Sequence, residues 1–513
     1  MKLARTLAVS LSGLVGDVVT VEAHLATHIP RFTLVGLPDA SLAEAKDRVR
    51  AAIESCGRIL PPQRITVNLQ PASLPKTGSG FDLAIAIAVL VANEPAAYRP
   101  SITDVVHIGE LGLDGAILPV RGVLPAVQAA KAAGYRAVVT SRANEAEARL
   151  VPEMDVLAFD HMSHLLHHYA LECTVTPMPV INRLAIAADD QCAEALDFSD
   201  VTGQDDAKHA LEVAAAGGHH VLLMGPPGTG KTMLASRLPT ILPPLDDDVA
   251  VAVSSVRSVL GTFSGTELVR TPPFVAPHHS ASRASLVGGG ARIARPGAIS
   301  QAHGGVLFLD EAPEFGAANL QLLRQPLESG EISIHRSQSV ATYPARFQLV
   351  LAANPCPCGN GHGKGARCRC TPLQKRRYLE ALSGPLLDRI DIRSHVMAPS
   401  TSRPLAGTET SAMIAQRVAN ARNRQAERWR DYPFSLNAHV PAKILRGADS
   451  PFPASARTML DPYLARGHIT LRGLDRILRL ALTLADLRGT APTRDDISTA
   501  LLLRIGDDHA HVA

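Results

Sequence analysis

One segment near the middle of the chain, VLLMGPPGTGKT from Val221 to Thr232, constrains the possible folds more than any other. Four apolar residues precede a glycine-rich loop, and a lysine and a threonine follow it. This is the order of a strand, a phosphate-binding loop and the start of a helix. Glycines let backbone N–H groups turn towards phosphate oxygens, and the first turn of a helix adds the positive end of its dipole. The segment therefore predicts an α/β fold that holds a nucleotide.

The loop within this segment predicts ATP and Mg²⁺ as cofactors. Lys231 would reach the β- and γ-phosphates, and the hydroxyl of Thr232 would ligate Mg²⁺. The predicted nucleotide-binding residues of the loop are Gly225, Pro226, Pro227, Gly228, Thr229, Gly230, Lys231 and Thr232.

Two later apolar segments end in polar side chains of the kind that hydrolysis needs. In VLFLDE, Asp310 would hold the Mg²⁺ shell, and Glu311 would orient and deprotonate the attacking water. In FQLVLAAN, Asn354 ends an apolar strand and would sense the γ-phosphate or the water. The alternative for Asn354 is a residue that caps a turn before Pro355.

The bulk composition fits a globular protein of several domains and limits what can be said of its partners. A chain of 513 residues exceeds what one hydrophobic core organises, so about two to four domains are expected. A net charge of +3 predicts by itself neither a nucleic-acid-binding protein nor a membrane-surface protein. Any basic surface must therefore be local.

No segment is expected to enter a membrane. The longest apolar run, residues 83–92, is shorter than the roughly 20 residues that a spanning helix needs. The N-terminus begins with basic and apolar residues, but Asp17 interrupts them and VVTVEAHL alternates, so a folded strand is expected rather than a signal peptide. Seven cysteines, an odd number, fit a reduced and cytoplasmic protein.

The order of strand-like and helix-like segments divides the chain into three folded regions. Residues 1–172 are α/β, with a strand at 65–69, a helix at 39–53 capped by Asp39 or Ser41, and a helix at 118–130. Residues 173–199 form a linker, and residues 200–397 form the α/β region with the nucleotide motifs. A linker rich in proline and serine leads to the helical residues 408–506, with helices at 413–430 and 471–487, and to a polar tail at 507–513.

Four cysteines in two close pairs follow Asn354. Nine residues separate Cys356 and Cys358 from Cys368 and Cys370, and four thiolates could close a tetrahedral Zn²⁺ site. The one-residue spacers are shorter than usual, so packed free thiols and a redox pair remain alternatives. The basic residues around the pairs, which suit either solvent or a DNA backbone, are Lys364, Arg367, Arg369, Lys375, Arg376 and Arg377.

Long blocks of the sequence resemble the YifB/ComM family of magnesium-chelatase-like AAA+ proteins, over nearly the whole chain. Among these blocks are RITVNLQPASLPKTGSGFDLAIA, GQDDAKHALEVAAAGGHHVLLMGPPGTGKT, APHHSASRASLVGGG, GVLFLDEAPEF, NPCPCG and SGPLLDRIDI. The resemblance implies a Lon-protease-like α/β N-terminal domain, an AAA+ P-loop NTPase core and a helical C-terminal lid. It also implies a homo-oligomeric ring, usually a hexamer, and places Gly203 and Gln204 of VTGQ at the adenine.

The same resemblance assigns catalytic roles to arginines. In SGPLLDRIDI, Arg389 would be the arginine finger that reaches the γ-phosphate of the next subunit. The alternative is an ion pair with Asp388 or Asp391. Arg472, at a predicted helix start, resembles the sensor-2 arginine, and Arg476 is the competing candidate.

The N-terminal region lacks the chemistry of the proteolytic domain that it resembles. Lon domains use a serine–lysine pair, and matching the motifs places Gly80 at the serine position and Leu124 at the lysine position. Ser79 with Lys76 is a look-alike pair on one glycine-rich loop. Acyl transfer needs a nucleophile and a base, so no peptidase activity is expected and the region is predicted to be a scaffold or binding module.

The family likeness further implies a DNA motor, namely a hexameric branch-migration helicase in recombination or natural transformation. Two insertions would contact branched or single-stranded DNA through Arg292, Arg295 and Arg336. A solvated hairpin is the alternative at 332–343. His278 and His279 receive no role.

Other functions remain open. One is a magnesium-chelatase-type ATPase, although the chain has no D-x-S-x-S metal-adhesion motif. Another is an ATP-dependent protease or regulatory motor acting on a protein partner, which the missing serine–lysine pair disfavours. A non-enzymatic ATP-sensing scaffold would leave Glu311 and Arg389 without a task. The four functions differ in what stimulates ATP hydrolysis: branched DNA, chelatase partners, unfolded protein or nothing.

Overall fold

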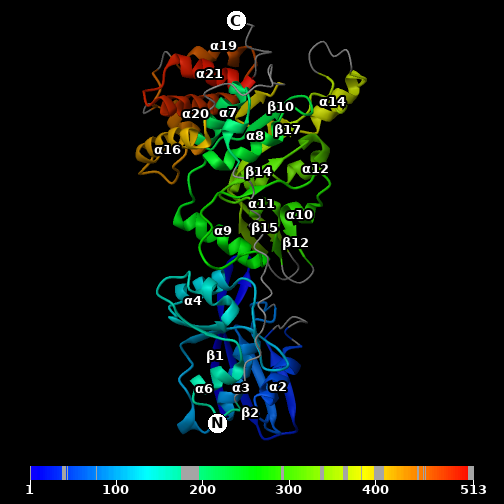
Figure 1. Cartoon of the computed structure of the whole chain (residues 1–513), viewed down its shortest axis with the longest axis vertical. Helices are drawn as coiled ribbons and strands as arrows, with labels where there is room; N and C mark the ends of the chain where they lie inside the picture. The colour runs from blue at the N-terminus through cyan, green and yellow to red at the C-terminus, as the bar shows by residue number, and fades with distance from the viewer. Residues whose placement is uncertain are drawn as a thin grey trace.

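The computed structural model describes residues 2–36, 42, 44–76, 78–174, 196–290, 294–335, 340–361, 368–382, 384–397, 409–447, 450–453, 456 and 458–505. Figure 1 shows an elongated molecule with the N-terminal residues at one end, a central sheet region, and the C-terminal helices at the other end. The predicted mixed α/β architecture is confirmed. Among the described residues, no helix combines the length and the apolar character that crossing a bilayer requires.

The N-terminal region (residues 2–174) is built on a seven-stranded sheet. Its elements are β1 (Lys2–Ser12), β2 (Val15–Ala26), β3 (Arg31–Val35), α2 (Ala45–Ser55), β4 (Arg64–Gln70), α3 (Asp82–Asn93), β5 (Val105–Ile108), β6 (Glu110–Leu111), β7 (Ile117–Leu118), α4 (Val123–Ala132), β8 (Ala137–Ser141), α5 (Glu145–Ala148), β9 (Asp155–Phe159) and α6 (Met162–His168). The strand order is β3-β4-β2-β1-β5-β8-β9. Helix α3 packs on β1 and β2 and is buried over nearly all its length, which explains the apolar run at 83–92.

The local predictions for this region have different outcomes. The strands expected at 65–69 and near the N-terminus lie within β4 and β2. Helix α2 begins at Ala45, and the expected caps Asp39 and Ser41 lie outside the described residues. The helix predicted from Leu118 is wrong at its start, because Leu118 belongs to β7 and α4 begins after Gly122. Gly122 has a φ of 77°, which a right-handed helix cannot include.

The central region (residues 196–397) is built on a five-stranded sheet. Its elements are α7 (Asp205–Gly217), β10 (Val221–Met224), α8 (Lys231–Arg237), α9 (Asp247–Leu260), β11 (Phe274–Val275), α10 (Arg283–Val287), β12 (Gly288–Gly289), β13 (Arg295–Pro296), α11 (Ala298–Gln301), β14 (Val306–Leu309), α12 (Gly316–Gln321), α13 (Arg324–Ser329), β15 (Glu331–His335), β16 (Val340–Pro344), β17 (Gln348–Ala353), α14 (Pro372–Glu380), α15 (Gly384–Leu387) and β18 (Ile392–His395). The order β11-β14-β17-β10-β18 is parallel throughout. The three predicted strands are confirmed as β10, β14 and β17, whose residues are almost all buried, as in parallel sheets generally.

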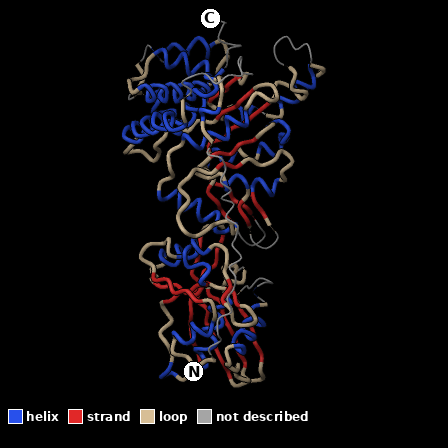
Figure 2. The backbone as a smooth tube through the Cα atoms, viewed as in Figure 1, coloured by secondary structure: helices blue, strands red, loops and turns tan. Residues whose placement is uncertain are grey.

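The C-terminal residues form helices that share a core with the central sheet, and Figure 2 shows them as a separate layer of helix beside the strands. They are α16 (Ser411–Arg428), α17 (Ala442–Arg446), α19 (Asp461–Ala465), α20 (Leu471–Arg488) and α21 (Arg494–Ile505). The helices predicted at 413–430 and 471–487 are thus confirmed as α16 and α20. Both pack against α7, and the amide of Gln425 donates to the carbonyl oxygen of Ala216 at 3.0 Å.

The N-terminal region contacts the central region at two places. At the first, the β1–β2 turn lies against β16, and Ser12 Oγ donates to the carbonyl oxygen of Val340 at 3.0 Å. At the second, α4 packs on α9, and the Glu147 carboxylate accepts hydrogen bonds from the backbone of Leu124 (2.9 Å) and the hydroxyl of Ser258. The N-terminal region therefore supports the β15–β16 hairpin along β16, close to the end at which Val340 pairs with His335.

Candidate functional site

The carboxyl ends of three neighbouring strands bring the nucleotide motifs to one edge of the central sheet. Met224 at the end of β10 pairs with Ala353 at the end of β17. Leu309 at the end of β14 pairs with Leu351 of β17. The residues that follow these strands therefore meet at one edge, where α/β proteins bind ligands.

Lys231 lies inside the glycine-rich loop and is in direct contact with Asn354. It is the first residue of α8 and is 7% exposed. Its Nζ donates to the carbonyl oxygens of Gly225 (2.7 Å) and Pro226 (2.8 Å) and to Oδ1 of Asn354 (3.1 Å). Burial lowers the pKa of Lys231, although the two acids after β14 oppose the effect. The predicted phosphate-binding cation and the predicted sensor thus form one unit.

The loop depends on glycine at two positions and is contacted by the segment before α7. A Cβ added to Gly225 would lie 2.1 Å from the carbonyl oxygen of Val396, and Gly230 has a φ of 86° just before α8. The Nε2 of Gln204 donates to the carbonyl oxygen of Thr229 at 2.6 Å. The VTGQ segment therefore lies beside the glycine-rich loop, and its role at the adenine stays a prediction.

Thr232 and Asp310 form a pair of oxygen donors. Oγ1 of Thr232 donates to Oδ2 of Asp310 at 2.7 Å, and the backbone of Glu311 donates to the other carboxylate oxygen at 2.9 Å. A hydroxyl and a carboxylate at this separation are hard oxygen ligands of the kind that Mg²⁺ prefers. The donor set therefore fits the predicted ion.

Glu311 has a strained backbone and a histidine neighbour. Its φ of 49° and ψ of 45° lie in the left-handed region, which costs a non-glycine residue about 1–3 kcal/mol and is typical of functional sites. Nδ1 of His279 lies 3.6 Å from Oε2 of Glu311. His279 follows β11, the strand next to β14, so the sheet order brings the two side chains together. Sequence reasoning missed this neighbour, because nothing local to His279 indicates it.

Arg389 lies near the amino ends of the parallel strands, whereas the glycine-rich loop follows the carboxyl end of β10. The carboxylate of Asp391 accepts a hydrogen bond from the backbone of His220, just before β10 starts, at 3.0 Å. The glycine-rich loop follows the end of the same strand. A four-residue strand spans about 13 Å, so Arg389, two residues before Asp391, is separated by the length of β10 from the loop of its own chain.

Arg389 is buried and surrounded by positive charge. Its side chain is 8% exposed and forms an ion pair with Glu328 of α13. The partners expected from the sequence, Asp388 and Asp391, are not the ones used in this ion pair. Burial lowers the pKa of Arg389, and three nearby arginines lower it further: Arg324, Arg472 and Arg476. These four arginines carry more positive charge than Glu328 neutralises, so an additional anion would be favourable there.

The two sensor-2 candidates differ in environment. Arg476 forms an ion pair with the buried Asp391. Burial by itself raises the pKa of Asp391, but Arg476 and His219 outweigh it and hold that pKa well below its usual range. Arg472 is exposed at the start of α20 and lies close enough to Arg389 to affect its pKa. Both arginines therefore lie near the Arg389 edge.

Only one of the predicted DNA contacts can be placed. Arg292 and Arg336 lie outside the described residues. Arg295 is exposed in β13, opposite Gly289 of β12. The strands on either side of the hairpin tip pair in register from Glu331 with Pro344 to His335 with Val340. The hairpin predicted at 332–343 therefore exists as β15 and β16.

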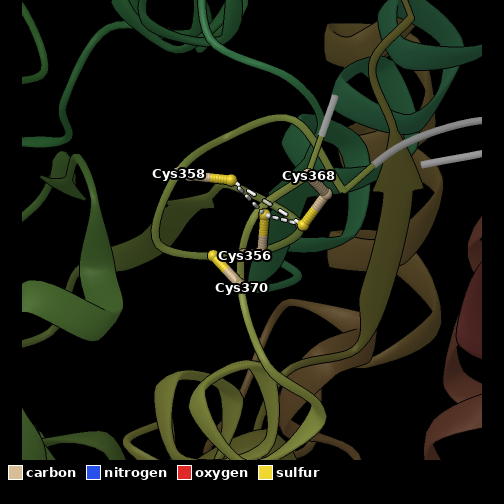
Figure 3. Close-up of side chains that lie close together, drawn as sticks. All are labelled: Cys356, Cys358, Cys368 and Cys370. Atoms are coloured by element: carbon tan, nitrogen blue, oxygen red, sulfur yellow. Dashed lines mark hydrogen bonds between the residues drawn. The ribbon is translucent and has the colours of Figure 1, made fainter. Parts of the chain in front are cut away.

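The four cysteines after β17 come together in a cysteine cluster (Figure 3), composed of Cys356, Cys358, Cys368 and Cys370. The sulfur atom of Cys356 lies 3.4 Å from that of Cys358 and 3.7 Å from that of Cys368, and the last two lie 3.7 Å apart. All four sulfur atoms lie within 4.8 Å of one another. Backbone hydrogen bonds lower the pKa of Cys358, whereas burial raises that of Cys356.

The serine and lysine of the N-terminal region do not form a catalytic pair with each other. Lys76 is fully buried, its Nζ donates to the carbonyl oxygen of Pro71, and burial lowers its pKa. The hydroxyl of Ser79 donates instead to the carboxylate of Glu110. Leu124 is buried in α4. Ser79 and Lys76 therefore have separate partners, and the absence of peptidase activity stays a prediction.

Comparisons with known proteins match three successive parts of the chain to family models and nearly the whole chain to individual relatives. Three family models match: "Subunit ChlI of Mg-chelatase" at residues 21–144, "Magnesium chelatase, subunit ChlI" at 197–403, and "Magnesium chelatase, subunit ChlI C-terminal" at 408–504. An uncharacterised protein of Mycobacterium tuberculosis is 47% identical over 98% of this chain and 99% of its own length. The uncharacterised protein YifB of Escherichia coli is 41% identical, and competence protein ComM of Haemophilus influenzae is 40% identical, each over 95% of this chain and 94% of its own length.

Proposed function

This chain belongs to the YifB/ComM family of magnesium-chelatase-like AAA+ proteins, and we propose that it hydrolyses ATP to remodel branched DNA. The observation that carries the ATPase part is the contact between Lys231 and Asn354 beside the Thr232–Asp310 pair. Groups that suit phosphate, water and Mg²⁺ meet there at one sheet edge.

Each residue of this edge has a distinct task in the proposed reaction. Lys231 exchanges its carbonyl partners for phosphate oxygens of ATP, while Asn354 holds the γ-phosphate or the attacking water. Glu311 orients that water and accepts its proton. Mg²⁺ held by Thr232 and Asp310 would neutralise charge on the phosphates. The half-exposed carboxylate of Glu311 is open to a water molecule on this side.

The position of Arg389 supports a shared active site. Arg389 is about one strand length from the loop of its own chain, so a second copy must supply the phosphate that it contacts. A head-to-tail ring provides that arrangement, since the loop edge of one subunit faces the Arg389 edge of the next. We propose a hexamer, in which Arg389 exchanges Glu328 for the γ-phosphate of the neighbour.

Exposed cations and one relative's name support DNA as the substrate. The ComM relative is named a competence protein. Exposed arginines occur at the start of α10 (Arg283), on β13 (Arg295) and on α14 (Arg377). Contacts to a phosphate backbone need only cations and hydrogen-bond donors, without base-reading groups. These elements are the proposed DNA contacts, with the β15–β16 hairpin as the tracking element.

A magnesium-chelatase-type ATPase or a regulatory motor acting on a protein is the alternative. The family models carry chelatase descriptions, which favour the ATPase module in general. YifB and ComM each match over 95% of this chain. DNA remodelling therefore remains the leading proposal.

A synthetic four-way junction with fluorescently labelled arms tests this proposal. Wild-type protein with ATP and Mg²⁺ is expected to separate the labelled arms, and Glu311→Gln protein is expected to bind the junction without moving it. Arms that stay in place while ATP is hydrolysed normally would reject DNA remodelling. The same assay on linear duplex controls for simple strand separation.

A further inference from the structure

We propose that the cysteine cluster binds one Zn²⁺ ion and that this metal site holds residues 354–361, which follow β17, and residues 368–371, which precede α14, in the arrangement that Asn354 requires. The metal-binding part does not depend on the proposed function. The effect on Asn354 rests on the proposed ATPase, and it is tested separately below.

The sulfur geometry fits one tetrahedral metal ion. A tetrahedron with Zn–S bonds of about 2.3 Å has S···S edges of about 3.8 Å. The three separations of 3.4, 3.7 and 3.7 Å lie close to that edge length, and Cys370 brings the fourth sulfur within 4.8 Å of the others. A disulfide would bring two sulfurs to about 2.05 Å. An iron–sulfur cluster needs room for several atoms between its ligands. One ion fits the space between these sulfurs.

Ligand type and position select zinc. Four soft thiolates suit Zn²⁺ and not the hard ion Mg²⁺ that the nucleotide edge would bind. One ligand, Cys356, is buried, and the other three are partly or fully exposed. A metal can therefore enter from solvent. Four protein ligands leave no open position, which is the arrangement of structural zinc sites and not of catalytic ones.

The cluster lies between two parts of the candidate ATPase site. Cys356 follows Asn354 by two residues, and Cys370 precedes α14. The α14 residue Tyr378 is buried and returns to the strand end, where its hydroxyl is within reach of a backbone hydrogen bond from Asn354. The chain thus leaves Asn354, passes through the four cysteines, and contacts Asn354 again.

The same loop also touches the phosphate-binding loop. Gly359, between the two cysteine pairs, has a φ of 76°, and a Cβ added there would lie 2.7 Å from Cδ of Pro227. Its backbone N–H donates to the carbonyl oxygen of Cys356 at 2.9 Å. A metal that fixes Cys356 and Cys358 therefore fixes the surface on which Pro227 rests. Loss of the metal would loosen Asn354 and this side of the loop together.

Metal content of the purified full-length protein tests the binding step. Wild-type protein and Cys173→Ser protein are each expected to contain about one zinc per chain, because Cys173 is a partly exposed cysteine outside the cluster. Cys358→Ser and Cys370→Ser proteins are expected to lose it. A mercurial reagent should release zinc from folded wild-type protein into a colour indicator, which does not rely on variants that fold. Protein purified without metal should bind Co²⁺ with the intense visible absorption of a tetrahedral thiolate site. Iron in place of zinc, or wild-type protein that neither contains zinc nor gives this cobalt spectrum, would overturn the proposal.

ATP hydrolysis before and after zinc removal tests the effect on Asn354. Zinc-stripped protein is expected to hydrolyse ATP at least tenfold more slowly and to recover when Zn²⁺ is restored. Unchanged hydrolysis after complete removal of zinc would overturn the proposed effect on Asn354, but it would not affect the proposal that the four cysteines bind zinc. Zinc-loaded wild-type protein that hydrolyses no faster than Glu311→Gln protein would instead reject the proposed function.

Discussion

The Nζ atom of Lys231 lies 3.1 Å from Oδ1 of Asn354, so the lysine of the glycine-rich loop and the amide at the end of β17 share a hydrogen bond. In the proposed reaction this contact persists with ATP bound, and Asn354 orients both Lys231 and the γ-phosphate or attacking water that Asn354 holds. Asn354→Ala should then reduce the rate of hydrolysis about 100-fold, the usual cost of losing one polar group that stabilises a transition state. ATP affinity should change little, as measured with a fluorescent ATP analogue. Asn420→Ala, an exposed residue of α16, is the control. Equal rates for the two variants would contradict the role of Asn354.

Glu311 is expected to act as the general base. Glu311→Gln should reduce hydrolysis by about 10²- to 10⁴-fold, because the amide cannot accept the proton of the water. Binding of ATP should persist, since Glu311 is not placed among the phosphate contacts. Glu314→Gln removes an exposed carboxylate three residues later and should leave the rate near that of wild type. A Glu311→Gln enzyme with more than a tenth of the wild-type rate would exclude this role.

His279 is expected to position Glu311. Its Nδ1 lies 3.6 Å from the carboxylate, and the backbone of Glu311 is strained. His279→Ala should therefore slow hydrolysis and alter the dependence of kcat on pH, with a smaller effect on KM. His279→Gln should restore part of the rate, because its amide can still donate to the carboxylate. A changed KM with an unchanged pH profile would indicate a purely structural effect.

Mixing of inactive subunits tests whether two copies share one active site. Lys231→Ala and Arg389→Ala proteins should each lack activity, and an arginine finger can be worth about 10³- to 10⁵-fold in rate. A mixture of the two should regain hydrolysis, because some interfaces combine an intact loop with an intact Arg389. Lys231→Ala mixed with Glu311→Gln should stay inactive, since both residues belong to the same edge. Recovery in both mixtures, or in neither, would argue against a shared site.

Buried neutral histidines should make the stability depend on pH. Burial lowers the pKa of His107 to about 4 from its ordinary value, and the same holds for His303. Between pH 6.5 and 4 the unfolded chain binds a proton at each position that the folded chain does not bind, so stability falls as the pH falls through this window. The loss at His107 is about 3 kcal/mol at the acid end. Thermal unfolding of His107→Gln protein should show a shallower pH dependence there, and a slope equal to that of wild type would contradict the assignment.

Features that the sequence predicts well are those set by a few neighbouring residues. The strand before the loop, the helix that starts at Lys231 and the two acids after β14 follow from local patterns, because glycine, lysine and carboxylate at those spacings have few other uses. The assembly of these motifs also follows, since parallel strands place their carboxyl ends at one edge. Cysteine spacing leaves a zinc site, packed free thiols and a redox pair open, and the sulfur separations are longer than the bond of a disulfide.

Features that depend on distant pairing could not be predicted. The ion pair of Arg389 runs to Glu328, on a helix far away in sequence, and not to the acids beside it. His279 meets Glu311 only because β11 lies next to β14 in the sheet. The start of α4 depends on the left-handed conformation of Gly122, which a helical pattern of apolar residues does not reveal.

The most direct test of the central claim is the rate of ATP hydrolysis by the purified protein without DNA, with linear duplex and with a four-way junction. Glu311→Gln protein sets the background. The account predicts hydrolysis above that background and a several-fold higher rate with the junction than with duplex or no DNA. Hydrolysis that is clearly above background but the same under all three conditions would contradict DNA remodelling and leave a protein or chelatase partner as the substrate to find.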